Sequence, residues 1–333
     1  MRAYAMALAN ILLISLGGTI TMTRSEAGGI TPTLTAEDLV KAVPGIDAVA
    51  SIKTLSPLRK PSPSLTLADL LALAQRLQEN FAGDIDGAVV IQGTDTIEET
   101  AFVLDCLVGG GKPIVVTGAM RGPEAAGADG PANILSASIV SASPSARGRG
   151  ALAVLNDEIH AARLVQKAHT ALPSAFRSPL GGTIGLVVEG EARFHARTER
   201  SPCLAGPFSD DDAPVALLRI GLDDDGRLLA ALPSLGFRGA VIEAMGAGHV
   251  PETLVQPIAS LSAQMPVVLA SRVHTGHVFS RTYGFPGSEI DLLKQGGISA
   301  GPLSGLKARL LLMLLLRSGK DSGAIVNAFA SFH

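Results

Sequence analysis

Residues 10–20 read NILLISLGGTI, an apolar run that ends in two glycines and a threonine. Residues 87–97 share this design and read GAVVIQGTDTI. A short continuous apolar run before turn residues is typical of a buried strand, and each run leads into a segment with a helical pattern. In an open α/β sheet the carboxyl ends of the strands form the crevice where ligands bind. We therefore expect Thr19 and Thr94 to face one another there, with Asp95 alongside.

Strand-like runs alternate with amphipathic stretches through the first half of the chain. We expect strands near residues 10–16, 87–91, 113–117 and 150–155, and helices near residues 35–43, 66–80, 96–108 and 130–141. This alternation predicts an α/β fold, in which a mostly parallel open sheet is covered by helices on both faces.

A second, smaller α/β unit is expected in the C-terminal part. We expect its strands near residues 215–220, 239–244 and 266–271, and its helices near residues 252–262, 289–295 and 304–318. Residues 193–214 are polar and lack periodicity, as is typical of an interdomain linker. A length of 333 residues also favours two domains. The expected domains are residues 1–192 and residues 215–333.

The composition describes a globular protein with much buried surface, because 47% of the residues are hydrophobic and 17% are charged. A net charge of −3 gives no basic surface for nucleic acid or for an anionic membrane. The expected partner is therefore a small-molecule substrate. Of the two cysteines, Cys106 lies in an apolar helical pattern and is expected to be buried and inert, which agrees with a reducing cytoplasm.

The N-terminal residues imitate a secretory signal peptide, since Arg2 precedes an apolar run. Cleavage after this run would remove the strand that presents Thr19, and the run is too short to span a bilayer. The apolar run at residues 310–316 is interpreted as part of a buried C-terminal helix. We expect a cytoplasmic protein.

The polar residues at the two strand ends suggest acyl chemistry. A neutral hydroxyl is a weak nucleophile and needs a base that takes its proton. A lysine serves as that base when burial or positive neighbours lower its pKa. Thr94 and Asp95 supply a hydroxyl and a carboxylate on one turn, and Lys167 could complete the set. This combination favours nucleophilic attack on a carbonyl, as in an amidase.

Five segments make the chain resemble the bacterial-type L-asparaginase/glutaminase family over nearly its whole length. They are ISLGGTI (14–20), QGTDTIEETAFVLD (92–105), TGAMRGPEAAGADGPANI (117–134), NDEIHAARLVQKAHT (156–170) and SRVHTG (271–276), in the family's order. The resemblance implies a larger catalytic N-terminal domain and a smaller C-terminal domain that completes the site and the dimer. It also implies homotetramers built as dimers of intimate dimers, and no metal or organic cofactor.

The resemblance further implies a role for each matching residue. Thr19 would be the attacking nucleophile, Thr94 the second catalytic threonine and Lys167 its base. Asp95 would anchor the substrate's α-amino group. The expected reaction is a two-step displacement that forms an acyl-enzyme on Thr19, releases ammonia and is completed by water.

The implied substrate-binding residues lie around this set. Ser56 falls where the family binds the α-carboxylate, and Ala119 would line the pocket floor. Gly18 and Gly93 adjoin the two threonines, where backbone N–H groups would polarise the scissile carbonyl. His249 occupies the position of a residue that the family lends across the dimer.

The chain also departs from the family pattern. Gly29 stands where the family has a tyrosine that partners the nucleophile, and Pro57 stands where it offers a polar side chain to the substrate. The acidic residue that the family lends after SRVHTG has no clear counterpart, since Thr282 and Tyr283 are the nearest residues. These departures favour a changed substrate over a changed reaction.

Each motif also has a plainer interpretation. Gly17 and Gly18 could form only a tight turn, although the glycine patterns that bind dinucleotides and phosphates are missing. Thr94 and Asp95 are also expected to cap the following helix, which is compatible with catalysis. His274 could suggest a metal site, but a structural role is favoured because no third ligand is in sight.

Three functions remain open at this point. The first is hydrolysis of the side-chain amide of L-asparagine or a related small carboxamide. The second is the same reaction on glutamine, a D-amide or another small amide or lactam. The third is a weakly active relative that binds an amino acid.

Overall fold

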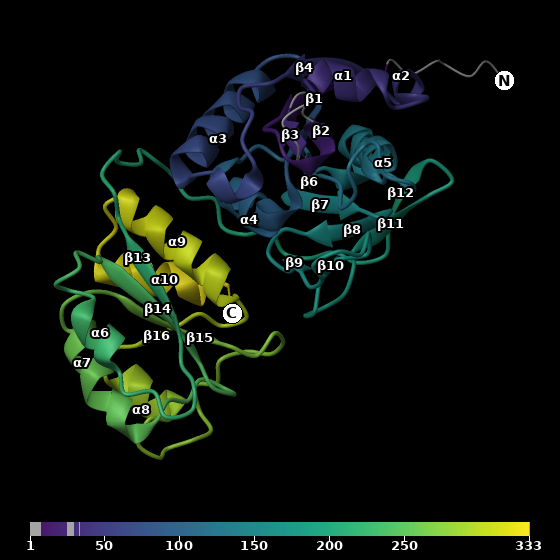
Figure 1. The fold of residues 1–333 in the computed structure, drawn as a ribbon. Coiled ribbons are helices and arrows are strands. Elements are labelled where there is room, and N and C mark those ends of the chain that lie inside the picture. The colour runs from purple at the N-terminus through teal and green to yellow at the C-terminus, as the bar shows by residue number, and fades with distance from the viewer. Residues whose placement is uncertain (1–7, 25–29, 33, 333) are drawn as a thin grey trace. The chain divides into compact units, whose positions relative to one another are not determined.

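The computed structural model describes residues 8–24, 30–32 and 34–332, and the chain divides into unit 1, Met1–Cys203, and unit 2, Leu204–His333 (Figure 1). The described part of unit 1 contains an eight-stranded sheet in the order β12-β11-β8-β7-β6-β5-β1-β4. Its strands are β4 (Ala50–Leu55), β1 (Ala9–Ser15), β5 (Gly87–Ile91), β6 (Ile114–Thr117), β7 (Ala151–Leu155), β8 (Glu158–Ala161), β11 (Gly185–Val188) and β12 (Glu191–Phe194).

The strands from β4 to β7 run parallel, and β8, β11 and β12 continue the sheet in antiparallel pairs. β5 and β6 are buried along their whole lengths, which is why their sequences are continuous apolar runs. The mostly parallel α/β sheet is thus confirmed, and the N-terminal apolar run forms its strand β1.

Helices cover both faces of this sheet (Figure 1). They are α1 (Ala36–Lys41), α2 (Ile46–Val49) and α5 (Gly130–Ala142) on one face, and α3 (Leu67–Phe81) and α4 (Ile97–Leu107) on the other. Leu13, Val89 and Val115 share a buried cluster with residues of α5. Cys106 of α4 is buried as expected, and this burial raises the pKa of its thiol.

Two short antiparallel pairs lie outside the large sheet. They are β2 (Met22–Arg24) with β3 (Ile30–Pro32), and β9 (Gln166–Lys167) with β10 (Phe176–Arg177). The second pair matters for function because it carries Lys167.

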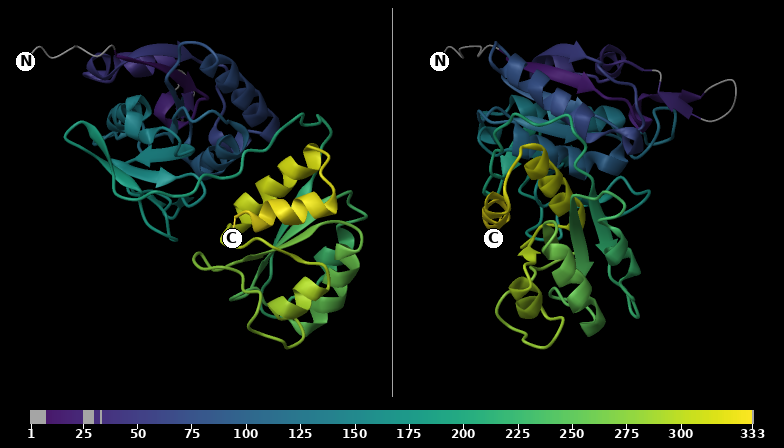
Figure 2. Two further views of the ribbon diagram at one scale, coloured as in Figure 1. Left: turned by 180° about the vertical axis from the view of Figure 1, so that it is seen from behind. Right: turned by 90° about the vertical axis from the view of Figure 1, so that its left-hand side faces the viewer.

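Unit 2 is built around a four-stranded parallel sheet in the order β13-β14-β15-β16. The strands are β13 (Val215–Arg219), β14 (Gly239–Ala244), β15 (Val267–Ser271) and β16 (Ile298–Ser299). The helices α6 (Arg227–Ala231), α7 (Val255–Ser262) and α8 (Glu289–Lys294) cover one face, and α9 (Gly305–Arg317) and α10 (Ser322–Ala330) cover the other (Figure 2). The separate, smaller α/β unit is thereby confirmed.

The apolar run at residues 310–316 lies in α9, where Leu311, Leu312 and Leu314 are fully buried. None of the helices in the described ranges has the length and apolar character needed to cross a membrane. Between β12 and β13, residues 195–214 form neither helix nor strand.

Candidate active site

The loops that follow β1 and β5 touch at the carboxyl edge of the sheet. The two strands are parallel neighbours, with Ser15 opposite Ile91. Gly18 has φ +94°, and a Cβ on this residue would lie 2.0 Å from the backbone nitrogen of Gly93. Only glycine tolerates both the backbone conformation and the close approach. The glycine pair therefore serves to bring the GGT loop against the GTDT loop.

Thr19 begins a short 3₁₀ turn, η1 (Thr19–Thr21), directly after this contact. Both the backbone N–H and the hydroxyl of Thr21 donate to the carbonyl of Gly18, at 2.9 and 2.8 Å. The side chain of Thr19 lies outside the described part of the chain, and so does Gly29.

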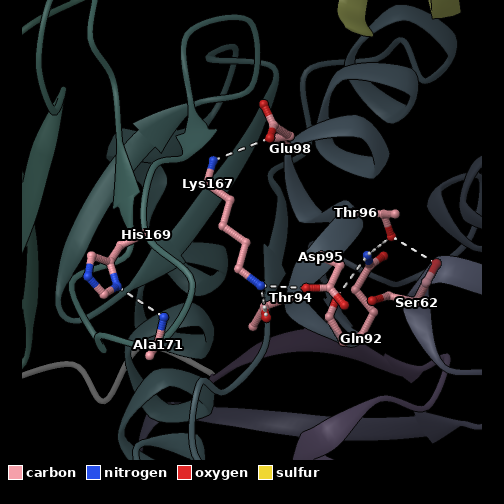
Figure 3. Close-up of polar contacts among 10 residues, drawn as sticks. Ser62, Gln92, Thr94, Asp95, Thr96, Glu98, Lys167, His169 and Ala171 are labelled. Atoms are coloured by element: carbon pink, nitrogen blue, oxygen red, sulfur yellow. Dashed lines mark hydrogen bonds and ion pairs between the residues drawn. The ribbon is translucent and has the colours of Figure 1, made fainter.

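Lys167, Thr94 and Asp95 form a hydrogen-bonded cluster (Figure 3). Nζ of Lys167 donates to Oγ1 of Thr94 at 2.9 Å and to Oδ1 of Asp95 at 2.5 Å. Thr94 is buried and the lysine side chain is only 15% exposed, whereas the side chain of Asp95 is 59% exposed. The cluster thus joins a shielded hydroxyl and amine to a carboxylate that a ligand can reach.

The β9–β10 hairpin carries Lys167 into this position. Lys167 lies opposite the buried Phe176 in the pair, and its backbone N–H donates to Glu98 of α4 at 3.3 Å. Just after β10, the hydroxyl of Ser178 lies 3.0 Å from Nδ1 of the buried His160 on β8. These contacts tie the hairpin to both α4 and the sheet.

The GTDT loop is held from the other side by a short chain of hydrogen bonds (Figure 3). The amide of Gln92 donates to Oγ1 of Thr96 at 3.0 Å, and Thr96 donates to the carbonyl of Ser62 at 3.2 Å. The expected capping of the next helix is wrong. The N-cap of α4 is Thr96, whose side chain makes no capping bond. The side chains of Thr94 and Asp95 contact Lys167 instead of the helix start.

This arrangement can move a proton. The amine of Lys167 and the hydroxyl of Thr94 are 2.9 Å apart, which is within the distance that proton transfer requires, and Asp95 holds the amine from the other side. A cavity of about 430 Å³ opens beside the pair, lined by Asp95, Lys167, Ala168, His169 and Thr170.

Three more of the expected site residues lie in the described part of the chain. Ser56 accepts the backbone N–H of Ala36 at 2.9 Å, at the start of α1. Ala119 is buried just beyond the end of β6. His249 belongs to unit 2, where its Nε2 lies 3.2 Å from the carboxylate of Glu289.

Two contributions were missed by sequence reasoning. Glu98 receives the N–H of Lys167, although its place in the first turn of α4 indicated only a favourable helix charge. His169 lines the cavity, and its position two residues after Lys167 was the signal that could have found it. Within the described ranges, no group of three His, Cys, Asp or Glu side chains could hold a metal ion.

Comparison with known proteins gives consistent matches. The family model "Asparaginase, N-terminal" matches residues 10–200, and "Glutaminase/Asparaginase C-terminal domain" matches residues 214–329. A protein named "Probable L-asparaginase" from Deinococcus radiodurans is 36% identical over 326 residues, covering 97% of either chain. An "L-asparaginase" from Bacillus licheniformis is 31% identical, with coverage of 93% of this chain and 96% of the relative.

A solved structure extends the match to three dimensions. It is titled as a probable cytoplasmic L-asparaginase from Campylobacter jejuni, with a TM-score of 0.85 and 33% identity. The alignment covers 97% of this chain and 99% of that one.

Proposed function

The chain belongs to the asparaginase family of amidohydrolases, and from this we propose that it hydrolyses the side-chain amide of L-asparagine, or of a related small carboxamide, to the acid and ammonia. The observation that carries the proposal is the contact of Lys167 Nζ with Thr94 and Asp95 at the carboxyl edge of the sheet. A buried amine and hydroxyl beside a reachable carboxylate suit proton transfer next to a bound amino acid.

In the proposed reaction, Thr19 is the nucleophile. Its Oγ1 attacks the amide carbon while its proton passes through Thr94 to Lys167, which returns a proton to the leaving ammonia. The product is an ester of Thr19, which water then hydrolyses with the same proton carriers. The role of Thr19 is supported by the contact between Gly18 and Gly93, because Thr19 follows Gly18 and Thr94 follows Gly93.

In the same proposal, Asp95 holds the substrate's ammonium, which its exposure allows. Ser56 binds the carboxylate, since its hydroxyl hydrogen stays available when Oγ accepts from Ala36. Ala119 lines the pocket floor, and the N–H groups near Gly18 and Gly93 polarise the carbonyl.

We propose a homo-oligomer, a dimer of intimate dimers, in which His249 of one copy serves the site of another. We also propose a cytoplasmic location and the domain division at residues 193–214. A measured mass in solution tests the oligomer.

The second candidate keeps the reaction and changes the substrate. It is favoured by Gly29 and Pro57, which stand where the family offers side chains to the nucleophile and the substrate. A panel of L-asparagine, L-glutamine, D-asparagine and small lactams, read by ammonia release or ring opening, decides between the two. Asparagine turnover equal to that of the best substrate would reject the second candidate.

The nucleophile and the relay are tested separately by substitution. We expect Thr19→Ala to abolish ammonia release, and Thr94→Val or Lys167→Met to lower kcat about 10²-fold or more, since each removes a proton carrier. Lys53→Met removes an exposed lysine of β4 and serves as the control. Unchanged ammonia release in Thr19→Ala would reject the proposed nucleophile.

A further inference from the structure

Lys167 lies in a segment with little secondary structure of its own. The strands β9 and β10 have two residues each, and an isolated pair of short strands is only marginally stable. The loop between them is exposed from Ala168 to Leu172. The position of the lysine amine therefore depends on contacts that hold this pair of strands against the rest of unit 1.

His160 of β8 lies on the face of the large sheet that α4 covers. Its neighbours Ile159 and Ala161 belong to the buried cluster under α5, on the other face, and successive side chains of a strand point to opposite faces. The residue is only 1% exposed. Because a buried polar ring costs free energy unless it is hydrogen-bonded, we expect this ring to make a polar contact that matters.

The two ring nitrogens of His160 face groups of different kinds. Nε2 lies 3.6 Å from the carboxylate of Glu158, and Nδ1 lies 3.0 Å from the hydroxyl of Ser178, the residue directly after β10. A neutral ring donates with one nitrogen and accepts with the other. Since an ionised carboxylate can only accept, the proton belongs on Nε2, and Nδ1 then accepts the hydroxyl proton of Ser178.

Carboxylate, imidazole and hydroxyl follow one another here as they do in a serine hydrolase triad. Ser178 is buried, however, and the cavity beside Lys167 is lined by other residues. A hydroxyl buried outside the cavity is badly placed to attack a substrate. The backbone carbonyl of Ser178 also accepts the N–H of Gly182 at 3.0 Å. These contacts therefore hold the end of β10 in place, and they give Ser178 no chemistry of its own.

We propose that His160 and Ser178 are positioning residues, which hold β10 against the sheet and so keep the amine of Lys167 at hydrogen-bonding distance from Thr94. The path is short, because Lys167 pairs with Phe176, two residues before Ser178. This inference rests on the proposed amide hydrolysis and adds to it the contact that places the base. Since a misplacement of about 1 Å costs a catalytic group about 10²-fold in rate, loss of the contact lowers kcat and changes KM little.

Ser178→Ala removes the hydroxyl with the least change in volume. We expect it to lower kcat for ammonia release about tenfold, with KM little changed. Ser138→Ala is the matched control, because Ser138 is a buried serine of α5 whose hydroxyl donates to the carbonyl of Ile134 at 2.8 Å. It should leave kcat as in wild type. Equal kcat in Ser178→Ala and wild type would overturn the proposal.

Two changes at His160 test the hydrogen bond itself. His160→Leu removes both nitrogens, whereas His160→Asn keeps an acceptor oxygen close to the place of Nδ1. We expect His160→Asn to regain most of the kcat that His160→Leu loses, because the hydroxyl of Ser178 keeps its acceptor. Equal losses in the two variants would mean that this hydrogen bond does not place the lysine.

A double-mutant cycle separates positioning from general support of the fold. If Ser178 acts through Lys167, its replacement has no amine left to misplace in the Lys167→Met protein. The double variant should then release ammonia as fast as Lys167→Met alone. A further loss of about tenfold in the double variant would show that Ser178 acts independently of the lysine, and would overturn the proposal.

Chemical labelling gives a decision that needs no turnover. Reductive methylation of lysine amines with formaldehyde, read by peptide mass spectrometry, compares wild type with Ser178→Ala. We expect Lys167 to be methylated about fivefold faster in the variant, because its amine is released from Thr94 and Asp95. Lys112, whose amine donates to the carbonyl of Phe81 at 2.8 Å, should react at an unchanged rate.

The labelling also keeps this inference apart from the proposed function. If wild type released no ammonia, the proposed hydrolysis would fail while the comparison of methylation rates still stood. An unchanged rate for Lys167 would overturn the positioning role of Ser178. An equal increase for Lys112 would overturn it too, since unit 1 would then have loosened as a whole.

Discussion

At the scale of single residues, the closest backbone approach in the site depends on glycine. A Cβ at Gly18 would lie 2.0 Å from the nitrogen of Gly93, and its φ of +94° is strained for any other residue. We predict that Gly18→Ala lowers the free energy of unfolding by more than about 3 kcal/mol, because one of the two loops must move. Urea denaturation followed by circular dichroism measures this loss.

The variant Gly45→Ala measures how much stability is lost through the left-handed backbone conformation alone, without a steric clash. Gly45 also has a positive φ, +77°, but a Cβ there would have no atom within 4 Å. Its replacement should cost only about 1–2 kcal/mol, the penalty of the left-handed conformation alone. Equal losses for the two variants would show that the contact with Gly93 carries no strain.

The lysine of the cluster illustrates the limit of residue-level prediction. Lys167 sits on a two-residue strand, and a segment that short has no periodicity to detect. Its pairing with Thr94 and Asp95 was expected only because the surrounding motif resembles a known family. His169 was missed because its ring is held by the backbone N–H groups of Ala171 and Leu172, which no side-chain pattern reveals.

At the scale of elements, the sequence predicted the strands correctly where a helix separates one strand from the next. The bounds expected for β5 and β14 match the structure, since β5 is an uninterrupted apolar run and β14 is apolar except for the buried Glu243. No strand was expected at β8, β11 or β12. Each of these strands has only four residues, and β8 and β12 mix polar with apolar residues. No helix separates β7 from β8 or β11 from β12, so no helical pattern marks where these strands begin and end.

In unit 2, one carboxylate joins a helix to the loop before it. Oε1 of Glu289, the first residue of α8, accepts the N–H groups of Thr282 and Tyr283 at 2.9 and 2.8 Å. Burial alone would raise the pKa of Glu289, but the N–H donors of Tyr283 and Thr282, with His249 nearby, hold this pKa below its usual value. The folded state therefore favours the ionised carboxylate.

A lowered pKa fixes the sign of the pH dependence. The stabilisation by Glu289 is fully present above the unfolded pKa of about 4.3 and is lost as the pH falls through the lower, folded value. We predict that Glu289→Gln lowers the free energy of unfolding by about 1–2 kcal/mol at neutral pH, and that this difference shrinks below about pH 4. Thermal unfolding of both proteins across this pH range provides the measurement.

Glu252→Gln is the matched control, because Glu252 is an exposed residue of η5 (Glu252–Leu254). It should leave stability unchanged at every pH tested. A difference between wild type and Glu289→Gln that stayed constant from neutral pH to pH 3 would contradict the role given to the ionised carboxylate.

At the scale of the whole molecule, the segment after β12, residues 195–208, is hydrogen-bonded to the rest of unit 1 only in its first part, residues 195–202. Asp105 of α4 is buried, and its two carboxylate oxygens accept the N–H groups of Ala151 and Ser201. Burial raises the pKa of Asp105 despite these donors. Arg200 adds a hydrogen bond to the carbonyl of Val108. By contrast, residues 203–208 make no backbone hydrogen bond within the described part of the chain.

This difference predicts where the folded chain is cut. A protease of broad specificity needs an exposed and unfastened backbone, so we expect its cleavage after β12 to fall within residues 203–208 and to spare residues 195–202. Asp105→Ala releases Ser201 and should make residues 195–202 about tenfold more susceptible, whereas Asp84→Ala, at an exposed aspartate, should not. Mass spectrometry of early fragments locates the cuts. Wild-type cleavage at residues 195–202 as fast as at 203–208 would mean that the buried carboxylate does not hold this segment.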